Sequence, residues 1–186
     1  IRTPLNAIVG FSEVLTMVEE QEERQNLIAL IQQNNTHLLR LFDDIVSISK
    51  LEARGASTLV KSTFELKEVF QALMVKYKPK ADDAGLTLKI EHVDSLPVLT
   101  TDRDRLREIL NQYLSNALKF TTEGQVTMGC SEYDGKWRVW VKDTGKGIPE
   151  DECNDSLFER FVKVDEFTPG MGLGLSICRA LAMTLD

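Results

Sequence analysis

The sequence predicts an α+β fold in which a helical stalk precedes an α/β sandwich. The first observation is a stretch, residues 22–53, whose apolar residues recur at steps of three and four, the spacing of a helix that packs along a narrow seam. The second is the segment Arg54-Gly55-Ala56-Ser57, which interrupts the helical pattern. The third is the mixed order of short strands and helices beyond it. We therefore expect a stalk at residues 1–55 and a second domain at 56–186.

The stalk is predicted to contain two helices, at residues 5–17 and 22–53. The second helix has roughly eight turns and carries a narrow apolar stripe. The first helix is less than half as long, so it is too short to cover that stripe. We expect a second copy of the chain to complete a four-helix bundle; the alternative is a hairpin that buries the stripe within one chain. The seam residues are Leu27, Ile31, Leu38, Leu41, Ile45 and Ile48, with Asn34 on the same line.

The second domain is predicted to pack its helices on one face of a mixed or antiparallel sheet. Its clearest local signal is Asp134-Gly135, which joins two alternating stretches as a hairpin turn does. The expected strands are residues 59–64, 86–92, 98–101, 124–133 and 136–143, and the expected helices are 66–80, 104–119 and one that runs from Gly174 toward Leu185.

Charge and cysteine content exclude several classes of protein. The 186-residue chain carries a formal net charge of −7 without a block of Lys or Arg, which argues against binding to nucleic acid or an anionic membrane surface. Its cysteines, Cys130, Cys153 and Cys178, are odd in number and widely spaced, which indicates neither a disulfide framework nor a zinc site and favours a reducing compartment. No apolar run approaches the roughly 20 residues that cross a bilayer, so we expect any membrane anchor to lie in other segments.

Three polar residues share one face of the helix expected at 104–119. Gln112, Asn116 and Lys119 are spaced at i, i+4 and i+7. Mg²⁺ accepts a neutral amide oxygen and completes its octahedron with water and phosphate oxygens, a role that suits Asn116. Lys119 could meet a phosphate one turn further on. Taken alone, this face is better interpreted as a polar solvent face.

The segment Asp143-Thr144-Gly145-Lys146-Gly147-Ile148 directly follows a predicted strand. A carboxylate accepts a hydrogen bond from the exocyclic amine of adenine, whereas guanine has a carbonyl there and would leave two acceptors facing each other. Asp143 would thus select ATP over GTP. Gly145 and Gly147 would let the backbone approach the base, although this segment is also an acceptable turn.

Glycines recur at the start of the last expected helix. In Gly170-Met171-Gly172-Leu173-Gly174-Leu175 the free N–H groups of a helix start could bind phosphate. The preceding segment contains Phe158, Arg160, Phe161, Phe167 and Pro169, and it has the size and irregularity of a lid. Arg160 could reach a phosphate; the alternative is an ordinary surface arginine.

The order of these segments resembles the GHKL ATP-binding fold of sensor histidine kinases, including those of hybrid two-component systems. The resemblance covers nearly the whole chain and implies Mg-ATP as cofactor, a homodimer formed through the stalk, and transfer of the γ-phosphate to a stalk histidine and then to an aspartate of a response-regulator receiver domain. It also implies the cytoplasmic portion of a membrane-anchored bacterial sensor. The matching segments are Asn116 to Thr121 (N box), Asp143 to Ile148 (G1 box), Leu157 to Phe161 (F box) and Gly170 to Leu175 (G2 box).

Carried onto this sequence, the resemblance assigns site residues to three roles. Catalytic roles fall on Lys119 and Arg160, with a phosphatase role for Thr3. Metal binding falls on Asn116, with Gln112 as the second amide. The expected nucleotide contacts are Asn116, Lys119, Asp143, Gly145, Gly147, Ile148, Phe158, Gly170, Gly172, Leu173 and Gly174.

The first residues, Ile1 to Asn6, resemble the end of the family's H box. The register places the phosphoacceptor histidine two positions before Ile1, so we expect no autophosphorylation at that site in the chain as given. Neither His37 nor His92 stands in an H-box context. Thr3 falls where the family uses a residue that orients water for dephosphorylation; its alternative role is helix N-capping beside Pro4.

Two departures from the family pattern bear on function. Gln112 stands where the family has its first N-box asparagine, and it keeps the amide on a longer arm; the chain also stops at Asp186, before the last strands expected of such a domain. Related ATPases place a glutamate at the Gln112 position to activate water. Because Glu108 lies one turn before Gln112, a GHKL-type ATPase stays open as an alternative. A second alternative is a non-catalytic module that only binds nucleotide and dimerises.

Overall fold

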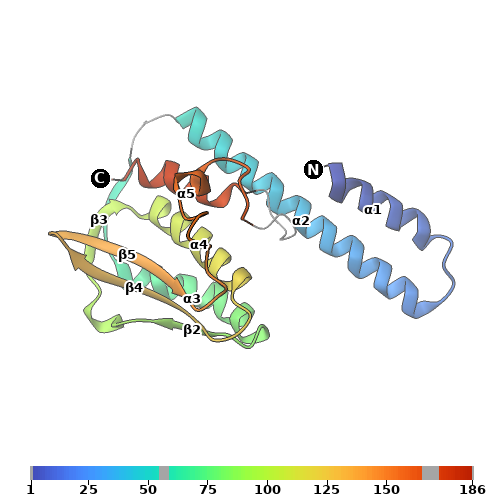
Figure 1. Ribbon diagram of the computed structural model, residues 1–186, viewed down its shortest axis with the longest axis horizontal. Coiled ribbons are helices and arrows are strands. Elements are labelled where there is room, and N and C mark those ends of the chain that lie inside the picture. The colour runs from blue at the N-terminus through green and yellow to red at the C-terminus, as the bar shows by residue number, and fades with distance from the viewer. Residues whose placement is uncertain (1, 55–58, 165–171, 186) are drawn as a thin grey trace.

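The structure is a computed structural model that describes residues 2–54, 59–164 and 172–185. Its stalk is a hairpin of α1 (Arg2–Leu15) and α2 (Gln21–Arg54). The hairpin extends away from the second domain, and α1 runs antiparallel along the first half of α2 (Figure 1). The Arg24 guanidinium donates hydrogen bonds to the carbonyls of Leu15, at 3.3 Å, and Val18, at 3.0 Å. This arginine thereby caps the end of α1 and joins the connecting turn to α2.

The predicted seam of α2 is partly covered within the single chain. Leu27, Ile31 and Leu38 are half-buried in the stalk hairpin, and Leu41 is buried on the part of α2 beyond the reach of α1. The side chain of Ile48 lies outside the described residues. The intramolecular hairpin therefore accounts for part of the stripe.

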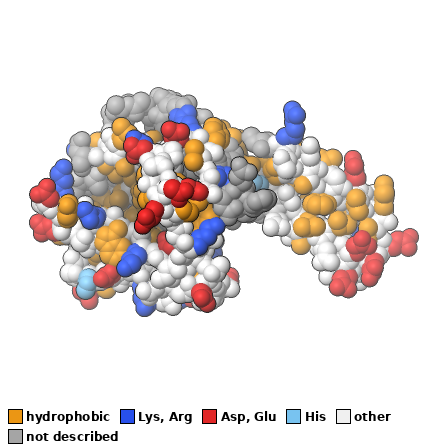
Figure 2. Space-filling model, in the orientation of Figure 1, with side chains coloured by type: hydrophobic (Ala, Val, Ile, Leu, Met, Phe, Trp, Pro, Cys, Tyr) orange, Lys and Arg blue, Asp and Glu red, His pale blue; other side chains and the backbone are white. Residues whose placement is uncertain are grey.

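The stalk nevertheless exposes a second set of large apolar side chains. They alternate with polar residues along both helices. Figure 2 shows hydrophobic side chains on the visible face of the hairpin, next to an acidic tip. Exposure of this extent on two adjacent helices is typical of a surface that another helix covers. The set comprises Leu5, Val9 and Val14 of α1 and Ile28, Leu30, Leu39 and Phe42 of α2.

The second domain has the α+β architecture that the sequence predicts. Strands β1 and β3 form an antiparallel pair, while β2, β4 and β5 form a mixed sheet in which β4 lies in the centre, parallel to β2 and antiparallel to β5. The elements are β1 (Lys61–Glu65), α3 (Leu66–Asp83), β2 (Thr87–Ile90), β3 (Val98–Asp102), α4 (Arg103–Phe120), β4 (Gln125–Tyr133), β5 (Lys136–Asp143) and α5 (Gly174–Ala182), with the short 3₁₀ helices η1 (Val93–Ser95) and η2 (Asp155–Phe158).

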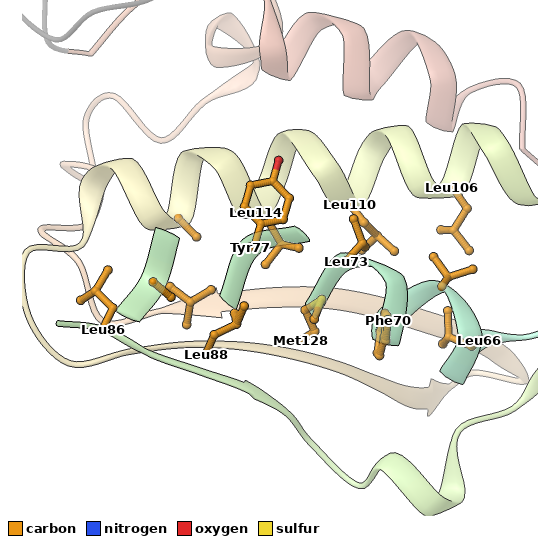
Figure 3. Close-up of a cluster of buried hydrophobic side chains, with 14 of the residues drawn as sticks. Leu66, Phe70, Leu73, Tyr77, Leu86, Leu88, Leu106, Leu110, Leu114 and Met128 are labelled. Atoms are coloured by element: carbon orange, nitrogen blue, oxygen red, sulfur yellow. The ribbon is translucent and has the colours of Figure 1, made fainter. Parts of the chain in front are cut away.

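A single apolar core holds α3 and α4 against the mixed sheet. Side chains at helical spacing on α4 point toward α3 and toward the inner face of β2 and β4 (Figure 3). The labelled members of this core are Leu66, Phe70, Leu73 and Tyr77 of α3, Leu106, Leu110 and Leu114 of α4, and Leu86, Leu88 and Met128 beside or within the strands.

Element boundaries differ from the predictions by a few residues, for local reasons. Strand β2 ends at Ile90 because His92 adopts a left-handed conformation with φ of 49° and starts the turn into η1. Helix α3 continues past Pro79 to Asp83. The hairpin turn at Asp134-Gly135 has φ of 51° and 69°, which are the positive values of a type I′ turn. No helix in the described part of the chain is long and apolar enough to cross a membrane.

Candidate functional site

The candidate site is built around the last two turns of α4. This helix begins at Asp102, whose buried carboxylate accepts a hydrogen bond from the backbone N–H of Arg105 at 3.1 Å and so caps the helix. The leucines of α4 face the core, which turns Gln112 and Asn116 to a half-buried flank and leaves Lys119 exposed. The predicted i, i+4, i+7 face is thus present.

The start of α5 lies directly on this flank. A Cβ added to Gly174 would stand 3.1 Å from Oε1 of Gln112 and 3.8 Å from Nδ2 of Asn116. The absence of a side chain at this position therefore brings the first turn of α5 against both amides. Helices α4 and α5 also pack together through a second apolar cluster, which consists of Ile109, Leu173, Ile177, Cys178 and Leu181.

The loop after β5 contacts the same helix one turn further on. A Cβ on Gly145 would lie 2.5 Å from the carbonyl oxygen of Phe120, the last residue of α4. The N–H of Lys146 donates to that carbonyl at 3.4 Å, and the N–H of Gly145 donates to Oδ1 of Asp143 at 2.9 Å. Asp143, the last residue of β5, is exposed at the start of this loop. Gly147 has φ of 70° with open space beside it, and Ile148 is exposed.

Two ammonium groups converge on the end of α4. The Nζ atoms of Lys119 and Lys146 lie 4.7 and 5.6 Å from the centroid of the Phe120 ring. The sequence pattern predicts a role for Lys119 and none for Lys146. The sequence feature that could have indicated a role for Lys146 is its position between the two glycines of the loop, because this loop folds back onto α4 and its side chain projects from it.

The described part of the segment between the two glycine motifs contacts α5 and Gly172 through two phenylalanines. Phe158 ends η2 and lies 5.9 Å, ring centroid to Cζ, from the guanidinium of Arg179 on α5. The N–H of Phe161 donates to the carbonyl of Gly172 at 3.1 Å. Arg160 is exposed two residues after Phe158. Residues 165–171, which include Gly170 of the predicted phosphate-binding segment, lie outside the described residues.

Leu173 and Thr3 differ from what the sequence suggested. The side chain of Leu173 is 1 % exposed in the cluster beneath α5, so any part it takes in nucleotide binding falls to its backbone. Helix α1 begins at Arg2, which places Thr3 inside the first turn, and the N-capping role considered for it is therefore wrong. Thr3 is exposed beside the buried Pro4.

The donor set suits a cation that keeps phosphate and water ligands. The described residues contain no group of three or more His, Cys, Asp and Glu side chains that could form a metal cage. Gln112 and Asn116 instead offer two amides on one flank, and Mg²⁺ is commonly bound through few protein oxygens together with substrate phosphates. The residues present therefore fit Mg²⁺ held jointly with a phosphate.

The cysteines allow a direct test of the packing of α5. Burial, followed by the nearby charge of Glu108, raises the pKa of Cys178 to about 12, whereas Cys153 is exposed and Cys130 is half-buried with a pKa raised by burial. With a chromogenic disulfide reagent at about pH 8, we expect a single fast thiol, because the thiolate is the reactive form. The fast phase should disappear in Cys153→Ser and persist in Cys178→Ser. A fast phase lost in Cys178→Ser would show that α5 is not packed on α4.

Comparison with known proteins gives two family matches along the chain. Residues 1–54 match the His Kinase A (phospho-acceptor) domain, and residues 101–186 match the histidine kinase-, DNA gyrase B- and HSP90-like ATPase domain. The histidine protein kinase DivJ of Caulobacter vibrioides is 38% identical over 188 residues, which are 98% of this chain and 31% of DivJ. The autoinducer 2 sensor kinase/phosphatase LuxQ of Vibrio parahaemolyticus is 35% identical over 197 residues, 100% of this chain and 23% of LuxQ.

Solved structures agree with these matches. Full-length ShkA in complex with AMPPNP superposes with a TM-score of 0.72 at 32% identity, over 98% of this chain and 38% of ShkA. Histidine kinase ThkA in complex with the response regulator protein TrrA gives a TM-score of 0.75 at 26% identity, over 96% of this chain and 50% of ThkA. The chain thus spans about a third or less of the length of these curated relatives.

Proposed function

Because the chain belongs to the sensor histidine kinase family, in which a phospho-acceptor stalk is joined to an ATP-binding domain, we propose that it is a kinase core that binds Mg-ATP. The γ-phosphoryl group passes to the phosphoacceptor histidine of the stalk helices, which the family register places two positions before Ile1: the bond from Pγ to the ADP oxygen breaks as a bond from Pγ to an imidazole nitrogen forms. The stalk is residues 1–55 and the ATP-binding domain residues 56–186.

One observation supports the nucleotide site above all others. Two segments that are far apart in the sequence, the start of α5 and the loop after β5, meet on the last turns of α4: Gly174 lies against Gln112 and Asn116, and Gly145 lies against the Phe120 carbonyl. The two glycines thus let the first turn of α5 and the loop after β5 pack against the same helix, and the N-terminus of α5 offers main-chain N–H groups to an anion. This arrangement suits a nucleotide with its base at Asp143 and its phosphates toward Lys119 and the start of α5.

Each residue of the site then has a distinct task. Asp143 accepts a hydrogen bond from the exocyclic amine of adenine, while Lys119 and Lys146 offset phosphate charge. Asn116, with Gln112 beside it, holds Mg²⁺, which offsets charge on the phosphate oxygens when bound. In phosphoryl transfer the protein contributes mainly position and charge stabilisation, and Arg160 adds positive charge beside the phosphates.

The ATPase alternative is less well supported. It needs a general base one turn before Asn116, and Gln112 has no basic group. Glu108 lies on α4 about two helical turns before Asn116, further away than a base at the Gln112 position would be. The full-length relatives that we compared are named kinases, which also disfavours a non-catalytic module.

The proposed partners follow from the stalk and from the family. A second copy of the chain covers the exposed apolar residues of α1 and α2, which gives a four-helix bundle. A response-regulator receiver domain accepts the phosphoryl group on an aspartate; ThkA, one of the similar structures, is in complex with such a regulator. Thr3 orients water for the reverse, phosphatase reaction, and the protein acts as the cytoplasmic part of a membrane-anchored sensor.

Nucleotide binding is the decisive test. We expect calorimetric titration to give saturable binding of ATP that weakens when Mg²⁺ is removed with a chelator, and much weaker binding of GTP. Asp143→Ala and Asn116→Ala should each reduce ATP affinity by at least about 100-fold, because a charge-assisted hydrogen bond or a metal ligand is lost. The exposed carboxylate Asp83 supplies the control, and Asp83→Ala should bind as the unsubstituted chain does. Unchanged affinity in both site variants would disprove the proposed function.

A further inference from the structure

Thr144 lies between the candidate base-binding residue Asp143 and Gly145, and its hydroxyl is held by the turn that precedes β4. The N–H of Gln125 donates to Oγ1 of Thr144 at 3.0 Å, and this hydroxyl donates to the carbonyl of Glu123 at 3.2 Å. The N–H of Thr144 also donates to the carbonyl of Gln125 at 3.2 Å. Both the backbone and the side chain of Thr144 are therefore bound to residues 123–125.

Gly124 leaves the space in which this hydroxyl sits. Its φ is 103°, and a Cβ at this position would lie 2.3 Å from Oγ1 of Thr144. The turn is itself fixed, because the carbonyl of Gly124 accepts a hydrogen bond from the N–H of Thr87, at the start of β2, at 3.0 Å. Thr144 is thus tied through one turn to two strands of the sheet.

The hydroxyl of Thr144 in this way fixes the peptide that orients Asp143. Asp143 is the last residue of β5 to pair with β4, opposite Val126. Its Oδ1 accepts a hydrogen bond from the N–H of Gly145, and the Cα of Gly145 packs closely against the Phe120 carbonyl. Oδ2 receives no hydrogen bond from any residue that the structure describes. A donor on a ligand could therefore complete the carboxylate, provided that the backbone on both sides of Thr144 keeps its place.

We propose that Thr144 is a positioning residue that directs the Asp143 carboxylate at the exocyclic amine of adenine and thereby determines selectivity for the base. This inference rests on the proposed nucleotide site and adds a specificity-determining residue to it. Thr144 itself does not touch the base. It acts through Asp143, so its removal should affect recognition of the amine more than binding of the phosphates.

The test compares two nucleotides that differ only at this amine: ATP and purine riboside triphosphate, which has a hydrogen in its place. Their affinities are measured by calorimetry for the whole chain and for Thr144→Val, which keeps the shape and loses the hydroxyl, and Thr144→Ser, which keeps the hydroxyl. Thr122→Val is the matched control, because Thr122 is exposed and its hydroxyl has no hydrogen bond to a described residue.

We expect the unsubstituted chain to prefer ATP. Thr144→Val should lose about tenfold in ATP affinity, the size of one hydrogen bond to a charged group, with less than about a twofold change for purine riboside triphosphate. Thr144→Ser and Thr122→Val should retain the preference for ATP.

Two results would overturn the role of Thr144 alone. One is an equal loss for both nucleotides in Thr144→Val, which would indicate general damage to the domain, and the other is an unchanged preference for ATP in that variant. No preference for ATP in the unsubstituted chain would overturn both the role of Thr144 and the recognition of the amine by Asp143. Failure of the unsubstituted chain to bind either nucleotide would instead overturn the proposed function, and the role of Thr144 with it.

Discussion

Replacement of Gly172 by alanine is expected to reduce ATP affinity by about 100-fold or more, equivalent to roughly 3 kcal/mol, while the domain stays folded. Gly172 has φ of 69°, and a Cβ there would lie 2.3 Å from the carbonyl oxygen of Val162 and 2.8 Å from the carbonyl carbon of Phe161. Both neighbours are backbone atoms, which cannot rotate away as a side chain can. The first turn of α5 would have to move from Gln112 and Asn116.

Gly85 provides a control that separates backbone strain from contact. Its φ is also 69°, but no atom lies within 4 Å of a Cβ added there. Gly85→Ala should therefore show only the strain of a left-handed alanine, about 1 kcal/mol in the free energy of unfolding, with ATP affinity unchanged. Calorimetric affinities and urea melts of both variants make the comparison. If Gly172→Ala bound ATP within about twofold of the unsubstituted chain, the position of the α5 start would not matter for binding.

The sequence predicts the elements of this fold well because most of their signals are local. Asp134-Gly135 requires a tight turn, and the spacing of Gln112, Asn116 and Lys119 places them on one face whatever surrounds the helix. The seam of α2 was harder to interpret, because a stripe of apolar residues does not say whether α1, another part of the chain or a second chain covers it.

Assembly of the site depends on contacts between segments that are distant in the sequence. The spacing of residues within one segment does not predict such contacts. Nothing local to Gly174 indicates that its missing side chain makes room for Gln112, about 60 residues earlier. The resemblance to histidine kinases predicted that these motifs belong together, but the structure adds how they meet. It also adds roles for two further residues: Lys146, which lies near the Phe120 ring, and Thr144, whose hydroxyl is held by the turn at Gly124.

Leu114→Ala is expected to lower the free energy of unfolding of the second domain by about 2 to 5 kcal/mol. Leu114 is fully buried on the face of α4 that points toward α3 in the apolar core (Figure 3), and shortening its isobutyl side chain to a methyl group leaves a cavity that the surrounding side chains fill only in part. Urea denaturation followed by tryptophan fluorescence measures this domain specifically, because both tryptophans of the chain, Trp137 and Trp140, are in β5.

The same helix carries the core and the candidate site on different faces, so the two effects can be separated. Val75 is 79 % exposed on α3, and Val75→Ala should change the free energy of unfolding by less than about 0.5 kcal/mol. In dilute urea, well below its transition, Leu114→Ala should still bind ATP within a few-fold of the unsubstituted chain, because Gln112 and Asn116 project from the flank that contacts α5. A loss of stability below about 1 kcal/mol would contradict the packing described here, since a leucine with no exposed surface cannot be shortened at so small a cost unless α4 lies elsewhere.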